Sequence, residues 1–272
     1  MKKSILPCFA ALATALMHAA PADDVKAAAK KLADAPSYAW TTTSETVGSQ
    51  FNAGPAEGVT EKGGYTVTTR SFNGNSTQTV RKGDQSVSQN QEGNWLTREE
   101  LMQQFANRGG SGGGNRGGAG DAKQGDANQG GNRGGGTRGG RGGGGFGFGG
   151  GGQNNPAEEV TALLAQAKNF KSADGAIVGD LSDEAVTQRL SFGGRGRGGQ
   201  GGDAPPAPKN ASGTVKFWLK DGAIAKYQVH VKGTTAGRNG EQERDTTTTV
   251  EIKDIGTAKV NVPDGAKKKL GA

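Results

Sequence analysis

Few residues of this chain could do acid–base chemistry, and their spacing does not favour it. His230 is the only histidine after the first 22 residues, since His18 lies in an apolar stretch near the N-terminus. A catalytic histidine needs a nucleophile and an orienting group within hydrogen-bond reach, and a metal site needs several ligands. We therefore expect His230 to be an ordinary strand residue that faces solvent on the side of the sheet away from the core.

Carboxylates are plentiful but scattered, and three adjacent pairs among them each stand at the start of a predicted helix. These pairs are Glu99-Glu100, Glu158-Glu159 and Asp183-Glu184. Carboxylates in the first turn of a helix bind free amides and interact favourably with the helix dipole, which explains the pairs without catalysis. The sequence thus predicts no catalytic residue, no metal, no cofactor, and a protein that is not an enzyme.

Arginines occur among glycines in two tracts, 108–153 and 193–212, which we interpret as disordered insertions. Glycine makes up 50 of the 272 residues and concentrates in these tracts. Arginine can neutralise phosphates, so the tracts could contact anionic envelope components such as lipid head groups or acidic polymers. The arginines concerned are Arg108, Arg116, Arg133, Arg138, Arg141, Arg195 and Arg197. RNA binding is the weakest hypothesis, because only Phe146 and Phe148 interleave with these arginines.

The positive charge of the chain belongs to its unusual segments. The net charge is +7, and Lys2 and Lys3 lie at the N-terminus. Residues 108–152 contain six basic and two acidic residues, and 193–212 contain three basic residues and one acidic residue. The remaining chain is close to neutral, so we expect no basic nucleic-acid face within the fold.

The N-terminus is typical of a secretory signal peptide. Two lysines precede the mostly apolar stretch Ile5–Met17, and small residues around Ala22 offer a cleavage site. We expect residues 1–22 to be removed and residues 23–272 to form one soluble, exported domain in the periplasm or outside the cell. The mature chain would contain no cysteine, because Cys8 is the only one. No later segment reaches the roughly 20 apolar residues of a membrane helix.

Alternating and helical patterns predict the elements of this domain. Helices are expected at 24–35, capped by Asp23 or Asp24, at 98–105 with a Thr97/Glu100 capping box, from Pro156 after an Asn155 cap, and at 182–190. The helix after Asn155 should carry its apolar stripe through Ala167 to Phe170. Strands are expected at 37–47, 63–72, 76–83, 85–93, 175–182, 213–233 as a hairpin, 244–255 and 258–263, followed by a basic tail at 264–269.

The hairpin at 213–233 can pair in two registers, and its turn decides between them. A three-residue turn, Lys220 to Gly222, pairs Leu219 with Ala223 and Val215 with Tyr227. It also pairs Trp218 with Ile224 on the face away from the core. We predict this turn because it keeps the large apolar residues of both strands on one face.

The order of these elements indicates an α+β fold. Strands follow one another as meanders, and nothing alternates as strand–helix–strand. We predict a single curved antiparallel sheet, an open or half barrel, with helices packed on its concave side.

Four segments carry a resemblance to a known family. They are SYAWTTT, GNWLTREEL, GTVKFWLKDGAIAKYQVHVKG and TTTTVEIKDIGTAKVNVPDGAKKKL. Together they resemble secreted bacterial proteins of the LolA-type lipoprotein carriers, including the LppX-like branch. The resemblance implies an unclosed β-barrel with a helical lid, and binding of lipid or lipoprotein acyl chains. The glycine-rich tracts depart from the family pattern.

Two hypotheses follow besides RNA binding. In the first, a carrier-like protein holds acyl chains in an apolar cavity between sheet and helices. In the second, the barrel is a scaffold and the cationic tracts contact anionic envelope polymers or lipid head groups. The apolar face is either packed core or cavity lining, and its residues are Trp40, Tyr65, Val67, Val215, Phe217, Leu219, Tyr227 and Val229.

Overall fold

One antiparallel sheet of eleven strands organises the chain. The computed structural model describes residues 20–49, 54–72, 74–109, 155–191, 206–237 and 240–271. The strand order is β6-β5-β4-β3-β2-β1-β11-β10-β9-β8-β7, and every described pair is antiparallel. Strands β6 and β7 form the two edges, so the sheet does not close. The predicted α+β class and the single open antiparallel sheet are confirmed.

The element bounds follow the chain from the first helix to the last. The helices are α1 (Pro21–Asp34), α2 (Arg98–Gly109), α3 (Pro156–Gln166), α4 (Asp183–Ser191) and α5 (Asp264–Lys269). The strands are β1 (Ser37–Thr46), β2 (Ala56–Glu61), β3 (Tyr65–Phe72), β4 (Asn75–Lys82), β5 (Gln85–Gln89), β6 (Trp95–Thr97), β7 (Ala167–Ala173), β8 (Ala176–Leu181), β9 (Lys209–Lys220), β10 (Ala223–Gly237) and β11 (Gly240–Lys253).

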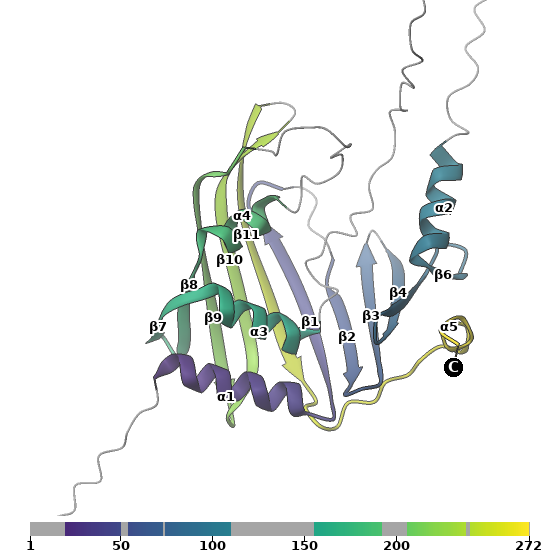
Figure 1. Ribbon diagram of the computed structural model, residues 1–272, viewed down its shortest axis with the longest axis horizontal. Coiled ribbons are helices and arrows are strands. Elements are labelled where there is room, and N and C mark those ends of the chain that lie inside the picture. Colours follow the sequence, from purple (N-terminus) through teal and green to yellow (C-terminus); the bar gives the residue numbers. More distant parts are fainter. Residues whose placement is uncertain are drawn as a thin grey trace, which may run out of the picture.

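Three helices cover one half of one sheet face. Helices α1, α3 and α4 lie across β7–β11, whereas α2 and α5 lie beside β5 and β6 at the opposite end (Figure 1). Helix α1 packs on α3 and on strands β7–β10, and α4 packs on β9 and β10. We call the face that carries α1, α3 and α4 the inner face, and the opposite one the outer face. The inner face of β2–β4 carries no helix among the described elements.

Local side-chain caps begin two of the helices as predicted. The Thr97 hydroxyl accepts from the Glu100 amide, and the Glu100 carboxylate accepts from the Thr97 amide, which completes the box before α2. The Asn155 side chain accepts from the Ala157 amide at the start of α3. Helix α1 differs from the prediction, because it begins at Pro21 and no side chain caps it. Proline fits the first turn, where its missing N–H would have no partner.

The hairpin of β9 and β10 contradicts the predicted register. The turn has two residues, with Asp221 at φ 52° and Gly222 at φ 70°, so that Lys220 pairs with Ala223. An irregularity between Ile224 and Lys226 then shifts the register. The predicted partners of Ile224 and Val215 are therefore wrong: Ile224 pairs with Leu219, and Val215 with Val229. Because the bulge adds one residue, Ile224 reaches the core and is fully buried, not placed on the far face.

Other boundaries also differ from the sequence prediction. Strand β2 was not predicted, and α2 runs to Gly109, past the predicted start of the first insertion at residue 108. Helix α3 ends at Gln166, and β7 takes up Ala167 and Phe170, which the helical stripe had included. Residues 258–263 form no strand, and the basic tail at 264–269 is helix α5. Strand β9 begins at Lys209, so residues 209–212 belong to the sheet, not to the second predicted insertion.

Two separate apolar clusters hold the sheet from its two faces. The larger one lies under α1, α3 and α4 and includes Leu32, Leu163, Phe217 and Tyr227. The smaller one joins Val80 and Val87 to the C-terminal segment through Val262, Ala266 and Leu270. Strand alternation places Val80 on the outer face, opposite Arg81 and Thr79. The C-terminal segment therefore packs behind the half of the sheet that no helix covers on the inner face.

Candidate functional site

Three rows of paired residues define the inner face of β1–β4. The first row is Tyr38, Thr60, Thr66 and Arg81, the second is Trp40, Gly58, Thr68 and Thr79, and the third is Thr42, Ala56, Arg70 and Thr77. Paired residues of antiparallel strands share a face, and successive rows lie two residues apart along each strand. Hydroxyl groups and two arginines thus continue the face that is apolar beneath the helices.

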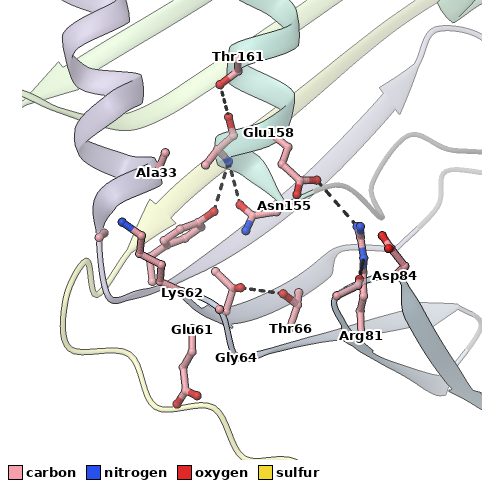
Figure 2. Close-up of a pocket in the computed structure, with 16 residues that line it drawn as sticks. Ala33, Glu61, Lys62, Gly64, Thr66, Arg81, Asp84, Asn155, Glu158 and Thr161 are labelled. Atoms are coloured by element: carbon pink, nitrogen blue, oxygen red, sulfur yellow. Dashed lines mark hydrogen bonds and ion pairs between the residues drawn. The ribbon is translucent and has the colours of Figure 1, made fainter. Parts of the chain in front are cut away.

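A cleft of about 700 Å³ opens where the first row meets the helix layer. It lies between the end of α1, the start of α3 and the strands β1–β4, and Figure 2 shows the side chains around it. The lining is mixed, with carboxylates, two cations, hydroxyls and an amide. It comprises Ala33, Ala35, Tyr38, Thr60, Glu61, Lys62, Gly63, Gly64, Thr66, Arg81, Gly83, Asp84, Asn155, Ala157, Glu158 and Thr161.

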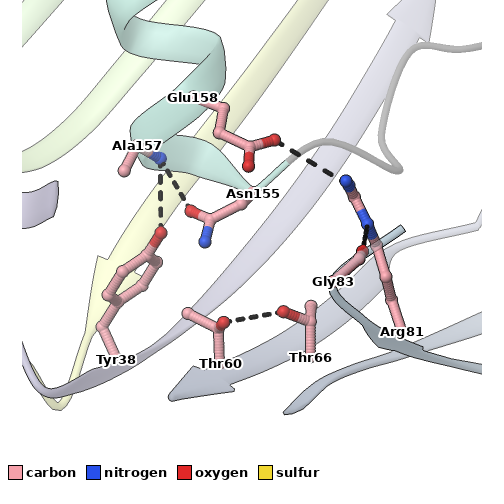
Figure 3. Close-up of polar contacts among 8 residues, drawn as sticks. All are labelled: Tyr38, Thr60, Thr66, Arg81, Gly83, Asn155, Ala157 and Glu158. Atoms are coloured by element: carbon pink, nitrogen blue, oxygen red, sulfur yellow. Dashed lines mark hydrogen bonds and ion pairs between the residues drawn. The ribbon is translucent and has the colours of Figure 1, made fainter. Parts of the chain in front are cut away.

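The start of α3 is tied to the sheet through polar contacts (Figure 3). The Ala157 amide donates to the Tyr38 hydroxyl over 3.3 Å as well as to the Asn155 side chain over 3.0 Å. Burial raises the pKa of Tyr38, so the phenol remains neutral. Arg81 Nη1 lies 3.8 Å from a carboxylate oxygen of Glu158, and Arg81 Nε donates to the Gly83 carbonyl. These contacts hold the first turn of α3 against β1 and β4.

A second polar cluster lies beneath α3. The buried Tyr227 hydroxyl donates to Glu159 over 2.9 Å, and Arg189 of α4 lies 3.5 Å from the other carboxylate oxygen. Burial, followed by the nearby Glu159 carboxylate, raises the pKa of Tyr227 well above its ordinary value. Glu159 therefore joins α3, α4 and β10 through one carboxylate.

The structure divides the predicted lining residues between the two faces. Trp40, Val215, Phe217, Tyr227 and Val229 belong to the larger cluster under the helices, and Leu219 packs against it. Tyr65 and Val67 lie on the outer face and pack on the C-terminal segment. A cavity between sheet and helices could therefore be lined by the six residues of the inner face, but not by Tyr65 and Val67. Of all eight, none borders the cleft described above.

The predicted anionic-surface residues fall mostly outside the described part of the chain. Arg116, Arg133, Arg138, Arg141, Arg195 and Arg197 lie beyond the described ranges, and Arg108 belongs to the end of α2 with its side chain outside them. The predicted signal peptide, residues 1–22, also lies outside the described ranges, apart from its last three residues. These predictions remain predictions.

His230 makes an ordinary surface pair. Its Nε2 lies 2.8 Å from an oxygen of Asp245, and both side chains are about one-third exposed, 36% and 34%. His230 shares with Trp218 the outer face of β9 and β10, as expected from strand alternation. Among the described residues, no three His, Cys, Asp or Glu side chains gather as a metal site would require.

Sequence reasoning overlooked the polar residues that the rows and the cleft bring together. Thr60, Thr66, Arg70 and Arg81 were absent from the predicted sites, as was Glu159 of the separate cluster beneath α3. The signal was present in β3, where Thr66, Thr68 and Arg70 alternate with Tyr65, Val67 and Thr69. Both sets could have been the inner one, because each contains residues that suit a half-buried strand. Pairing with β2 and β4 decides which set faces the helices.

Comparison with known proteins gives a distant structural likeness. No family model and no curated protein sequence matches the chain. The crystal structure of the Mycobacterium tuberculosis lipoprotein LppX matches with a TM-score of 0.42 and 10% identity, over 89% of this chain and 98% of that one. LprF from Mycobacterium bovis matches with a TM-score of 0.41 and 10% identity, over 90% and 97%. The first of these two proteins is the one after which the LppX-like branch is named. Within the described ranges, no helix combines the length and hydropathy that crossing a membrane requires.

Proposed function

We propose that this protein is an exported, non-enzymatic carrier-like protein that binds the acyl chain of a lipid or lipoprotein between its sheet and helices. One observation carries the proposal. Tyr38 and Ala157 belong to the apolar cluster beneath the helices and also line the cleft. The cleft is therefore a point at which a ligand can reach the apolar face without crossing a strand.

Helix α3 is the element whose movement would admit an acyl chain. Its buried side chains Val160 and Leu163 cover the same cluster as Phe217 and Tyr227. Its first turn buries Pro156 and Ala157 and also contacts the sheet through hydrogen bonds and the long Arg81–Glu158 pair, which face the cleft. Lifting this turn would extend the cleft toward Tyr227. An entering chain would replace the side-chain contacts of α3, and each buried CH₂ contributes about 0.8 kcal/mol to such binding.

The residues around the cleft support binding in preference to catalysis. Its carboxylates are engaged or exposed, with Glu158 beside Arg81 and Asp84 on a turn. The hydroxyls of Thr60 and Thr66 bond to each other over 2.7 Å. No histidine or cysteine occurs among the residues that line the cleft. Apolar burial at the inner end and polar contacts at the mouth suit an amphiphile.

The test is binding of a fluorescent fatty acid to the full chain, together with mass spectrometry of lipid extracted from protein purified out of its host's envelope. We expect saturable binding and a co-purifying lipid. Thr161→Trp fills the cleft from an exposed position of α3, and we expect it to weaken binding at least tenfold. Ala165→Trp places the same ring one turn further along α3, outside the cleft lining, and should bind as the parent does.

The opposite results would remove the proposal. Absence of both extracted lipid and fatty-acid binding would mean that the apolar face is ordinary packed core. Equal binding by the Thr161 and Ala165 variants would show that ligands do not enter through this cleft. Loss of envelope association after deletion of residues 109–152, with no lipid bound, would favour the scaffold hypothesis.

A further inference from the structure

Arg70 is a partly buried cation whose charge no neighbouring side chain offsets. It lies in the middle of β3, on the inner face, between Ala56 of β2 and Thr77 of β4. Burial lowers the pKa of its guanidinium, and no carboxylate counteracts this effect. Within the described part of the chain, the Arg70 side chain makes no ion pair and no hydrogen bond. Partial desolvation of an unpaired charge is costly, and a bound anion would offset that cost.

The strands around Arg70 keep their carboxylates away from it. The acidic residues of β1–β4 are Glu45, Glu57 and Glu61, and strand alternation directs all three away from the face of Arg70. Glu61, the last residue of β2, borders the cleft two rows away from Arg70. The inner face offers hydroxyls instead, from residues such as Thr42, Thr68, Thr77 and Thr79. The other cation on this face, Arg81, already lies beside Glu158. Arg70 is therefore the centre of a cationic, hydroxyl-rich patch.

The row that contains Arg70 leads directly into the apolar cluster. From Arg70 it passes Ala56 and Thr42, then Val250, and continues through Tyr227 and Phe217 to Ile177. Strands lie about 4.8 Å apart, so Arg70 and Val250 are separated by roughly 14 Å across the sheet. Small or short side chains, Ala56 and Thr42, occupy the interval. One row thus carries a cation at one end and buried apolar residues at the other.

We propose that the patch around Arg70 binds the phosphate-bearing head group of the lipid whose acyl chain lies beneath the helices. This inference rests on the proposed function and names its ligand class, an anionic amphiphile. Arg70 donates to the phosphate oxygens, and the threonine hydroxyls complete the contacts. The alkyl chain follows the row past Ala56 toward Val250. The occupant is a lipid head group, not free phosphate, because the apolar end of the row requires a chain.

The experiment measures binding of three probes to the full chain by isothermal titration calorimetry below the critical micelle concentrations. The probes are dodecyl phosphate, dodecyl maltoside and inorganic phosphate. We expect dodecyl phosphate to bind at least tenfold more tightly than dodecyl maltoside, since hydrogen bonds between charged groups are stronger than those between neutral ones. Arg70→Gln should abolish this preference and leave dodecyl maltoside binding unchanged. Arg98→Gln, on the exposed start of α2, should retain it.

Thermal unfolding without ligand gives an independent measurement. Arg70→Gln should unfold at the parent's temperature or above it, because the substitution removes an uncompensated charge. A drop of more than about 5 °C would assign Arg70 a structural role and overturn the proposal. Arg70→Lys should keep part of the phosphate preference, since it keeps the charge but loses the planar pair of donors.

The outcomes separate the two proposals. Equal affinity for both dodecyl probes, unchanged in Arg70→Gln, would overturn the head-group site and leave the acyl-chain proposal standing. No binding of either dodecyl probe would overturn both proposals. Binding of inorganic phosphate as tight as that of dodecyl phosphate would show an anion site without a lipid and contradict the inference.

Discussion

The indole ring of Trp40 lies directly over Gly58 on the neighbouring strand. The two residues pair across β1 and β2, and a Cβ atom on Gly58 would overlap the six-membered ring. Trp40 is nearly buried, with 4% of its surface exposed, and it packs against the Tyr38 ring at a centroid distance of 5.8 Å. Because Gly58 has no side chain, the Trp40 ring can lie over it, at the border between the apolar cluster and the hydroxyl-rich rows.

Gly58→Ala should destabilise the protein by about 1–3 kcal/mol, the usual cost of overpacking. The added methyl group would force the indole out of its position, which should also change the tryptophan fluorescence. Urea unfolding measures the free energy. The double variant Gly58→Ala/Trp40→Phe, compared with Trp40→Phe alone, should show a much smaller loss. An equally large loss in both backgrounds would contradict the assigned contact.

Tyr227→Phe should cost about 1–3 kcal/mol, because it removes the buried hydroxyl that donates to Glu159. Tyr38→Phe is the matched control, since the Ala157 amide would still donate to Asn155. We expect the Tyr38 variant to lose clearly less stability in urea unfolding. Equal losses of stability in the two variants would contradict the larger contribution that we assign to the hydrogen bond between Tyr227 and Glu159.

The pKa of Asp34 should be about 2 in the folded protein, below the ordinary aspartate value of 3.8. Hydrogen bonds from Lys30, at 2.6 Å, and Lys62, at 3.0 Å, stabilise the carboxylate. A depressed folded pKa means that the stabilisation is complete above the unfolded pKa of about 4 and is lost as the pH falls through 2. Carboxyl NMR titration measures the value. In 1 M salt, or in Lys62→Gln, the pKa of Asp34 should rise, and an unchanged value would contradict the contact between α1 and the turn after β2.

Asp221→Gly distinguishes the observed hairpin turn from the predicted one. In the two-residue turn Asp221 has φ 52°, so glycine should relieve strain and leave stability unchanged or slightly higher. In the three-residue turn Asp221 would have a right-handed backbone conformation. Glycine would then relieve no strain, and it would destabilise the protein by raising the conformational entropy of the unfolded chain. Gly222→Ala should cost about 1 kcal/mol, because its φ is 70°. Urea unfolding of both variants measures the change in the free energy of unfolding. A clear loss of stability in Asp221→Gly would favour the three-residue turn.

Local patterns predicted the parts of the fold that depend on neighbouring residues. The capping box of Thr97 and Glu100 and the Asn155 cap need only contacts within one helical turn. The candidate site could not be predicted in the same way. Tyr38 and Ala157 are 119 positions apart, and their contact exists only because α3 folds back onto β1.

The sequence by itself determined most of the strands, the caps at Thr97 and Asn155, the absence of a cysteine after Cys8 and the single histidine after His18. These follow from composition, alternation and contacts over a few residues. Tertiary structure alone decided that Tyr65 faces the C-terminal segment while Thr66 and Arg70 share the inner face with Trp40. The physical reason is that a shift of one residue exchanges the two faces of a strand. Pairing with distant strands and the bulge after Ile224 fix that choice, and neither is a local property.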